Sequence, residues 1–120
     1  MKIMIVDDST AMRMIVRKTL RLAGFEGHDF SEADDGMKAL AAIKASPPDI
    51  VLSDWNMPNM TGIELLEALT KAGIKVKFGF VTTEATPDMR QLATTAGASF
   101  LISKPFTPES FKAALGGHIK

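Results

Sequence analysis

The sequence contains no cysteine, which excludes disulfide bonds, thiolate metal ligands and cysteine nucleophiles. It also has no excess charge of either sign, because 14 Lys and Arg residues balance 14 Asp and Glu residues. No overall field therefore attracts the protein to nucleic acid or to an anionic membrane, and we expect neither as a partner. The function must come from a local site.

Long hydrophobic runs are also missing. The apolar N-terminal run, residues 1–6, ends at Asp7 and is too short for a signal peptide or a membrane span. With 120 residues, 46% of them hydrophobic, the chain suits a single domain over residues 1–120 with a real core. We therefore expect a soluble, cytoplasmic protein of one domain.

Short apolar runs mark the strands. Four of them, bounded by polar or turn residues, predict strands buried on both faces: Ile3–Val6, Ile50–Leu52, Phe78–Val81 and Phe100–Ile102. A fifth run, His28–Glu32, has Phe30 as its single large apolar residue. We place this fifth run at an edge of the sheet, where one side is wet.

The stretches between these runs have helical spacing. In the first stretch Ala11, Ile15 and Leu22 form an apolar stripe that is typical of an amphipathic helix. Arg13, Arg17 and Arg21 recur every fourth residue on another face of the same helix. Further helices are predicted at Gly36–Ala45, Gly62–Ala72, Pro87–Ala96 and after Thr107, which is followed by Pro108 at the first helical position.

Strand and helix alternate five times, which predicts an α/β fold with a five-stranded parallel sheet. Right-handed crossovers put helices on both faces and give a three-layer α/β/α sandwich. With the weak second strand at an edge, the expected strand order is 2-1-3-4-5. Ligands of such sheets bind at the carboxyl ends of the strands, so we expect the site where Val6 and Ser53 end.

Acidic residues follow two strands that this order places side by side. Asp7 and Asp8 come after the first strand, and Asp54 comes after the third. Neighbouring strands are about 4.8 Å apart, so the three carboxylates crowd into one crevice. An oxygen-only pocket with open positions suits Mg²⁺, and we predict that these three residues hold the ion.

Phosphate explains the remaining polar residues at this edge. A metal-bound Asp54 can attack phosphorus, while Lys104 offers a cation and the Thr82 hydroxyl can donate to a phosphoryl oxygen. The sequence has neither a GxxxxGK(S/T) loop nor a GxGxxG motif to hold a nucleotide at this edge. The phosphoryl group would therefore arrive on a partner or a small donor and stay on Asp54.

Each residue also has an ordinary structural interpretation. The acidic pair or Ser9 could cap the first helix, and Asp54 could be a turn former. Lys104 and Thr82 could be an ordinary solvated lysine and an ordinary strand residue. None of these interpretations explains why the right chemistry falls at the same end of four strands.

In these residues the chain resembles the receiver domains of two-component response regulators, over essentially its whole length. The matching positions are Asp7-Asp8-Ser9, Ser53-Asp54, Met57-Pro58 with Gly62, Thr82 and Lys104-Pro105-Phe106. Within the family, the single-domain chemotaxis regulators are the most similar, through the segment 53–60 and through Val81, Thr82, Glu84 and Ala85. The resemblance implies a flavodoxin-like fold and makes the Lys104-Pro105 bond a cis candidate.

The resemblance also implies roles for the site residues. Asp54 would be phosphorylated from a phosphohistidine of a sensor histidine kinase, of the CheA-like kind in chemotaxis. Asp8, Asp54 and the backbone carbonyl of Asn56 would ligate Mg²⁺ directly, and Asp7 would act through water. Thr82 would move toward the phosphoryl group, and Lys104 would pair with it.

The resemblance further implies a phospho-acceptor signalling protein, not an enzyme, with self-catalysed phosphorylation and autodephosphorylation. The chain ends just after the fifth helix, so we expect output by contact with a protein effector such as the flagellar motor switch, a possible phosphatase partner and a monomeric state. The fourth helix, fifth strand and fifth helix would form the output surface. Leu101 stands where chemotaxis regulators usually carry an aromatic switch residue, Phe100 should point to the other side of the strand, and Thr83 replaces a common Ala.

Other functions remain as alternatives. The chain could be a phosphorelay receiver or another single-domain receiver outside chemotaxis. A haloacid-dehalogenase-type phosphatase also uses an Asp nucleophile and Mg²⁺, but it needs a second Asp where this chain has Asn56. A flavodoxin-like FMN module would have a phosphate loop rich in Ser, Thr and Gly, whereas Asp7 and Asp8 would repel the phosphate.

Overall fold

The computed structural model describes residues 1–25, 27–83 and 85–117, and its five parallel strands lie in the order β2-β1-β3-β4-β5. The strands are β1 (Lys2–Val6), β2 (Asp29–Ala33), β3 (Ile50–Ser53), β4 (Lys77–Thr82) and β5 (Phe100–Ser103). The helices are α1 (Thr10–Leu22), α2 (Gly36–Ala45), α3 (Gly62–Lys71), α4 (Pro87–Ala96) and α5 (Pro108–Leu115). The predicted α/β class, the strand order and the edge position of β2 are confirmed.

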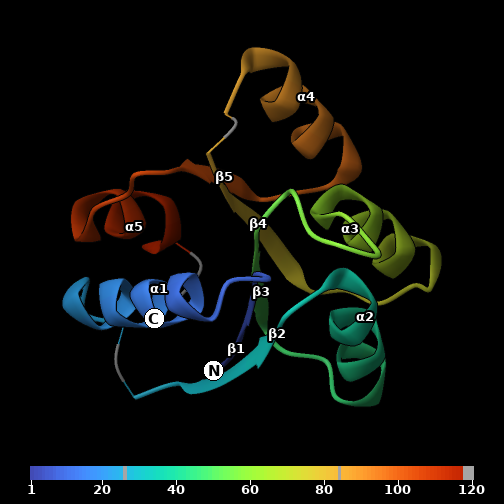
Figure 1. Ribbon diagram of the computed structural model, residues 1–120, viewed down its shortest axis with the longest axis horizontal. Coiled ribbons are helices and arrows are strands. Elements are labelled where there is room, and N and C mark those ends of the chain that lie inside the picture. The colour runs from blue at the N-terminus through green and yellow to red at the C-terminus, as the bar shows by residue number, and fades with distance from the viewer. Residues whose placement is uncertain (26, 84, 118–120) are drawn as a thin grey trace.

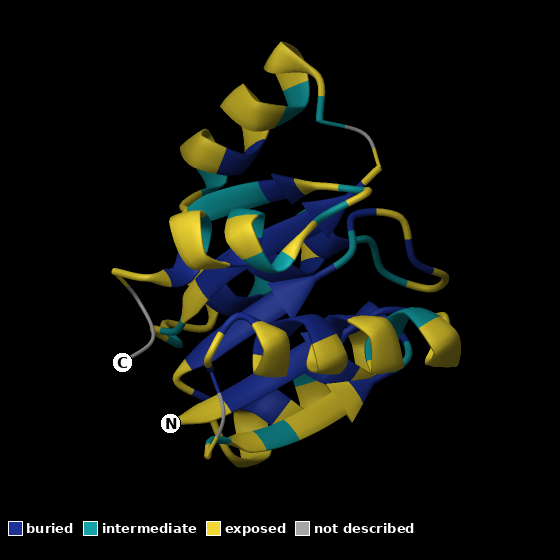
Figure 2. Cartoon of the chain, turned by 90° about the vertical axis from the view of Figure 1, so that its left-hand side faces the viewer, coloured by how far each residue is buried: buried dark blue, intermediate teal, exposed yellow. Residues whose placement is uncertain are grey.

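Helices cover both faces of the sheet, with α1 and α5 on one side and α2, α3 and α4 on the other (Figure 1). Each side has its own core. The side of α1 and α5 is built around Ile3, Ile5, Leu20, Ile50, Leu52 and Phe111, and the opposite side around Val6, Ile43, Val51, Leu65, Phe78 and Phe80. The central strands β1 and β3 are largely buried on both faces (Figure 2). Alternate residues of one strand therefore belong to different cores. This sandwiching fixes where the strands end.

Every helix begins at a residue whose side chain accepts a backbone N–H of the first turn. The N-cap residues are Ser9, Asp35, Thr61, Thr86 and Thr107. The predicted cap at Thr107 with Pro108 after it is confirmed. Among the described residues, no helix has the length and apolar character needed to cross a membrane.

The apolar stripe expected along α1 does not face the core, so this prediction is wrong. Ile15 and Leu22 are 47% and 61% exposed, and the buried residues of the helix are Val16, Thr19 and Leu20. The buried face is offset by one residue along the chain, a rotation of about 100°. Burial of Thr19 is possible because its hydroxyl donates to the Ile15 carbonyl at 2.7 Å.

Phe100 and Leu101 point to opposite faces of the sheet, as expected for neighbours in a strand. Phe100 packs on the α1 and α5 side, and Leu101 packs on the α2, α3 and α4 side. The Phe100 ring lies over Gly79, its partner in the register of β4 and β5, so that a Cβ on Gly79 would overlap the ring. The aromatic ring therefore fills the space that a side chain on β4 would occupy.

This contact predicts the effect of substitutions at both positions. Gly79→Ala should destabilise the fold by about 1–3 kcal/mol, because the Phe100 ring must leave its place. In the double variant Gly79→Ala with Phe100→Ala, the new methyl group meets no ring. The double variant should therefore lose less stability than the sum of the losses in the two single variants. Urea unfolding of the four proteins measures the coupling. Additive losses would show that the ring does not set the cost at Gly79.

Candidate functional site

Hydrogen bonds that continue past the strand ends fix the residues that follow β1, β3 and β5. The Asp7 N–H donates to the Ala33 carbonyl at 3.1 Å, and the Asp54 N–H donates to the Val6 carbonyl at 2.9 Å. In the same way the Lys104 N–H donates to the Thr82 carbonyl at 2.8 Å. The backbone of each residue is therefore held by the sheet although it lies in a loop.

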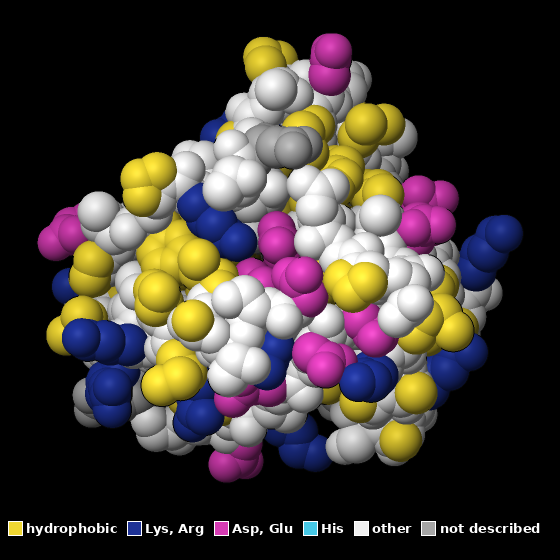
Figure 3. Space-filling model, in the orientation of Figure 1, with side chains coloured by type: hydrophobic (Ala, Val, Ile, Leu, Met, Phe, Trp, Pro, Cys, Tyr) yellow, Lys and Arg dark blue, Asp and Glu magenta, His cyan; other side chains and the backbone are white. Residues whose placement is uncertain are grey.

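The three predicted carboxylates meet at this edge. One oxygen atom from each of Asp7, Asp8 and Asp54 lies within 4.8 Å of the other two. Asp7 is buried, Asp54 is half-buried and Asp8 is exposed, so the cluster opens to solvent at one side. Figure 3 shows acidic side chains gathered near the middle of the face that carries the strand ends.

Lys104 is the cation of the cluster. Its Nζ lies 3.3 Å from Asp7 Oδ2 and 3.7 Å from Asp54 Oδ1. The Lys104 and Asp54 side chains are only 11% and 15% exposed, which leaves little water to screen them. Three negative charges thus face one positive charge, and the site as a whole attracts a further cation.

This environment raises the pKa of the Asp54 carboxyl. Burial is the largest cause, and the negative charges of Asp7 and Asp8 act in the same direction. The Lys104 ammonium and the N–H of Trp55, which donates to Asp54 Oδ1 at 2.8 Å, act against it. The charged form of Asp54 is therefore costly in the folded protein without a bound cation.

The other predicted site residues lie on adjoining segments. Thr82 is fully buried at the end of β4, the strand next to β3, and Asn56 is exposed in the loop after Asp54. Thr83 is exposed just beyond Thr82. Glu84, which contributed to the resemblance, lies outside the described residues.

The loop between β3 and α3 is anchored on both sides. A Cβ on Gly62 would overlap the Asp54 carbonyl oxygen, so the first turn of α3 approaches β3 as closely as glycine allows. Asn59 has a left-handed φ of 66°, and its amide donates to Asp35 Oδ2 at 3.1 Å. Asp35, which caps α2, thereby holds the loop that carries Asn56.

Sequence reasoning missed Asp35, Asn59 and Arg13. Arg13 is not simply solvated, because its guanidinium donates to the Asp7 carbonyl and pairs with Glu32 at 2.9 Å. The position of Arg13 one turn into the helix after Asp7 is the signal that could have revealed this contact. The helix-capping interpretation was correct for Ser9, whose side chain accepts the Met12 N–H, while Asp7 accepts the N–H of Ser9. The expected cis Lys104-Pro105 bond is confirmed.

The chain belongs to the response regulator receiver domain family, whose profile matches residues 3–116. It is similar to the chemotaxis protein CheY of Pseudomonas aeruginosa, with 43% identity over 115 residues that cover 93% of this chain and 90% of that protein. Chemotaxis protein CheY-3 of Vibrio cholerae is 42% identical over 118 residues, which cover 96% of this chain and 88% of that protein. Among solved structures, the chemotaxis response regulator CheY4 of Vibrio cholerae matches with a TM-score of 0.85 and 34% identity over 98% of both chains.

The raised pKa of Asp54 predicts that Asp54→Asn stabilises the metal-free protein. Asparagine keeps the shape and can still accept the Trp55 N–H, but it carries no buried charge, so we expect Tm at pH 7 to rise by about 4 °C. Folding favours the protonated form of a group with a raised pKa, so the stability of the parent falls as pH rises through that pKa. The difference should therefore vanish below about pH 4, where Asp54 is protonated in both the folded and the unfolded state.

Calorimetry in EDTA at both pH values measures this difference. Glu67→Gln, which removes an exposed charge in α3, is the matched control and should leave Tm unchanged. A lower Tm for Asp54→Asn at pH 7 would show that the Lys104 contact outweighs burial and repulsion.

Proposed function

We propose that residues 1–120 form a single receiver domain in which Asp54 is the phospho-acceptor of a two-component signalling system. The observation that carries the proposal is the place of Asp54 at the end of β3, with two further carboxylates and the Lys104 ammonium beside it. In the transfer, an Asp54 carboxylate oxygen bonds to phosphorus while the bond from phosphorus to the donor breaks. The donor leaves with that electron pair.

The donor set at this edge fits Mg²⁺, which prefers hard oxygen ligands. In our proposal Asp8, Asp54 and the backbone carbonyl of Asn56 hold the ion directly, and Asp7 holds it through water. When bound, Mg²⁺ neutralises charge on the transferring phosphoryl group. It would also offset the burial and the carboxylate repulsion that together raise the Asp54 pKa, so metal binding and ionisation of Asp54 support each other.

Lys104 and Thr82 complete the proposed site. Lys104 already lies within 3.7 Å of Asp54 Oδ1, so its ammonium can pair with a phosphoryl oxygen attached there. Thr82 would move its hydroxyl toward the same group from the end of β4. The protein would thus be a phospho-acceptor that catalyses its own phosphorylation and dephosphorylation and turns over no separate substrate.

Similarity to the CheY proteins of Pseudomonas aeruginosa and Vibrio cholerae supports a role in cytoplasmic chemotaxis signalling. A sensor histidine kinase would supply the phosphoryl group, and a protein effector would read it at the surface formed by α4, β5 and α5. A cleft of about 420 Å³ lies on this surface and includes Arg90, Leu101 and Ser110. Leu101 is half-buried against the core on the α2, α3 and α4 side, so activation would repack an aliphatic side chain where the related regulators use an aromatic ring.

Phosphorylation by a small donor tests the proposal. Mg²⁺ with acetyl phosphate should add one phosphoryl group, seen by native mass spectrometry, and Asp54→Asn should abolish the addition because it removes the nucleophilic oxygen. Asp88→Asn, on the exposed first turn of α4, is the matched control and should react like the parent. An unchanged parent mass with several donors, or an unchanged reaction in Asp54→Asn, would refute the assignment.

The fluorescence of Trp55 provides an independent measurement of metal binding at the site. The Trp55 indole is buried against Phe80 with ring centroids 4.6 Å apart, and the backbone N–H of Trp55 donates to Asp54 Oδ1. We therefore expect the fluorescence of Trp55 to change at millimolar Mg²⁺. Asp8→Asn should weaken the response by about tenfold in Mg²⁺ concentration, because one charged ligand is lost. The control Asp49→Asn, at an exposed residue that precedes β3, should leave the Mg²⁺ response of the fluorescence unchanged. No response, or one that Asp8→Asn does not shift, would contradict the site.

A further inference from the structure

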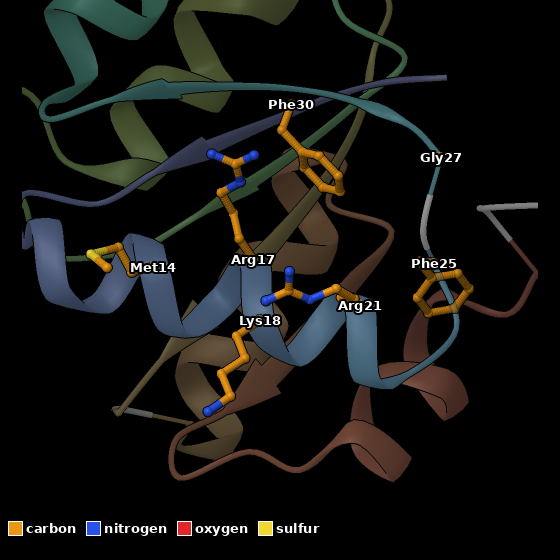
Figure 4. Close-up of a pocket in the computed structure, with 7 residues that line it drawn as sticks. All are labelled: Met14, Arg17, Lys18, Arg21, Phe25, Gly27 and Phe30. Atoms are coloured by element: carbon orange, nitrogen blue, oxygen red, sulfur yellow. The ribbon is translucent and has the colours of Figure 1, made fainter.

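A second cleft lies between α1 and the segment that leads into β2, away from the carboxylate cluster. It has a volume of about 430 Å³ and is lined by Met14, Arg17, Lys18, Arg21, Phe25, Gly27 and Phe30. We name it the α1–β2 cleft. Figure 4 shows three basic side chains extending from α1 and two phenyl rings contributed by residues 25 and 30.

The lining of the α1–β2 cleft is positively charged. Lys18 and Arg21 are exposed and form no ion pair with any described residue, and none of the described residues that line the cleft is acidic. Arg17 pairs with Glu32 at 3.3 Å, which offsets one of the three positive charges. The remaining charge would attract an anion, and arginine and lysine are the side chains that bind phosphate groups best.

The Arg17 guanidinium lies over the Phe30 ring, beside these cations. The Arg17 guanidinium carbon lies 5.2 Å from the centroid of the Phe30 ring, and the salt bridge to Glu32 holds the guanidinium in that position. The Arg17 side chain is nevertheless 50% exposed, so a planar group can stack on its outer face. In Figure 4 Arg17 extends toward Phe30, whereas Lys18 points away from it.

The cleft combines the exposed face of Arg17 with two further cations of α1 that form no ion pair with a described residue. Lys18 directly follows Arg17, and Arg21 lies one turn further along the helix. We propose that the α1–β2 cleft binds a nucleoside phosphate, with the base stacked on the Arg17 guanidinium that Phe30 supports and the phosphates contacted by Arg21 and Lys18. Its volume falls within the roughly 300–1,000 Å³ of small-molecule sites. The cleft spans only two turns of α1 and one short segment, which suits a small ligand better than an extended peptide.

Titration of the full chain with ATP and GTP in EDTA-containing buffer tests the proposal without involving a metal at the carboxylate cluster. At least one of the nucleotides should shift the amide NMR signals of residues 17–21 and 27–30. Arg21→Ala should weaken its affinity by about tenfold, because a phosphate contact is lost. Lys71→Ala, which removes an exposed cation from the last turn of α3, is the matched control and should change nothing.

Two further ligands separate stacking from charge. Tripolyphosphate should bind at least about tenfold more weakly than the nucleotide, because it has no base to stack on Arg17. Adenosine should bind more weakly still, because it has no phosphates. Phe30→Leu should weaken nucleotide binding and leave tripolyphosphate binding unchanged. Equal affinity for nucleotide and tripolyphosphate would reduce the cleft to an unspecific cationic patch and overturn the proposal. Absence of shifts in these two segments with both nucleotides at millimolar concentration would also overturn it.

Discussion

Three carboxylates held within a few ångströms of one another are the feature on which this molecule depends. Asp7 and Asp54 cannot separate, because each is tied to the neighbouring strand by its own backbone N–H. The Lys104 ammonium neutralises only part of the negative charge of the three carboxylates. The folded chain therefore carries an electrostatic cost at one edge of the sheet, and a cation or a proton lowers it. The packing of the sheet between two helical layers stabilises the fold enough to hold these residues in place despite their repulsion.

Several contacts hold the loops around the carboxylate cluster in place. The caps at Ser9 and Asp35 hold the loops after β1 and before α2, and the bond from Asn59 to Asp35 extends this support to the β3–α3 loop. Arg13 adds a contact to the Asp7 carbonyl from α1. These contacts leave the carboxylates few alternative positions, which is the preorganisation that binding of a small, hard cation needs. Loops that look like simple connections in the sequence are thus structural parts of the site.

Much of this arrangement could be predicted from the sequence, because buried parallel strands appear as unbroken apolar runs and their polar ends fall at one edge. The meeting of Asp7, Asp8, Asp54 and Lys104 needed no more than strand order. The orientation of α1 could not be predicted so simply. Its buried face includes Thr19, whose polarity is hidden by a bond to its own helix, while the apolar Ile15 is exposed. The contact between Asp35 and Asn59 also escaped prediction, because it joins two loops whose relative positions exist only after packing.

The contact between Phe100 and Gly79 also bears on how this chain can evolve. A ring from β5 occupies the volume above Gly79, so any larger residue on β4 meets an obstacle that lies 21 positions away in the sequence. A lineage that gains a side chain at Gly79 must also replace Phe100 with something smaller, and either order passes through a destabilised intermediate. Relatives that differ from this chain at one of the two positions should therefore differ at the other.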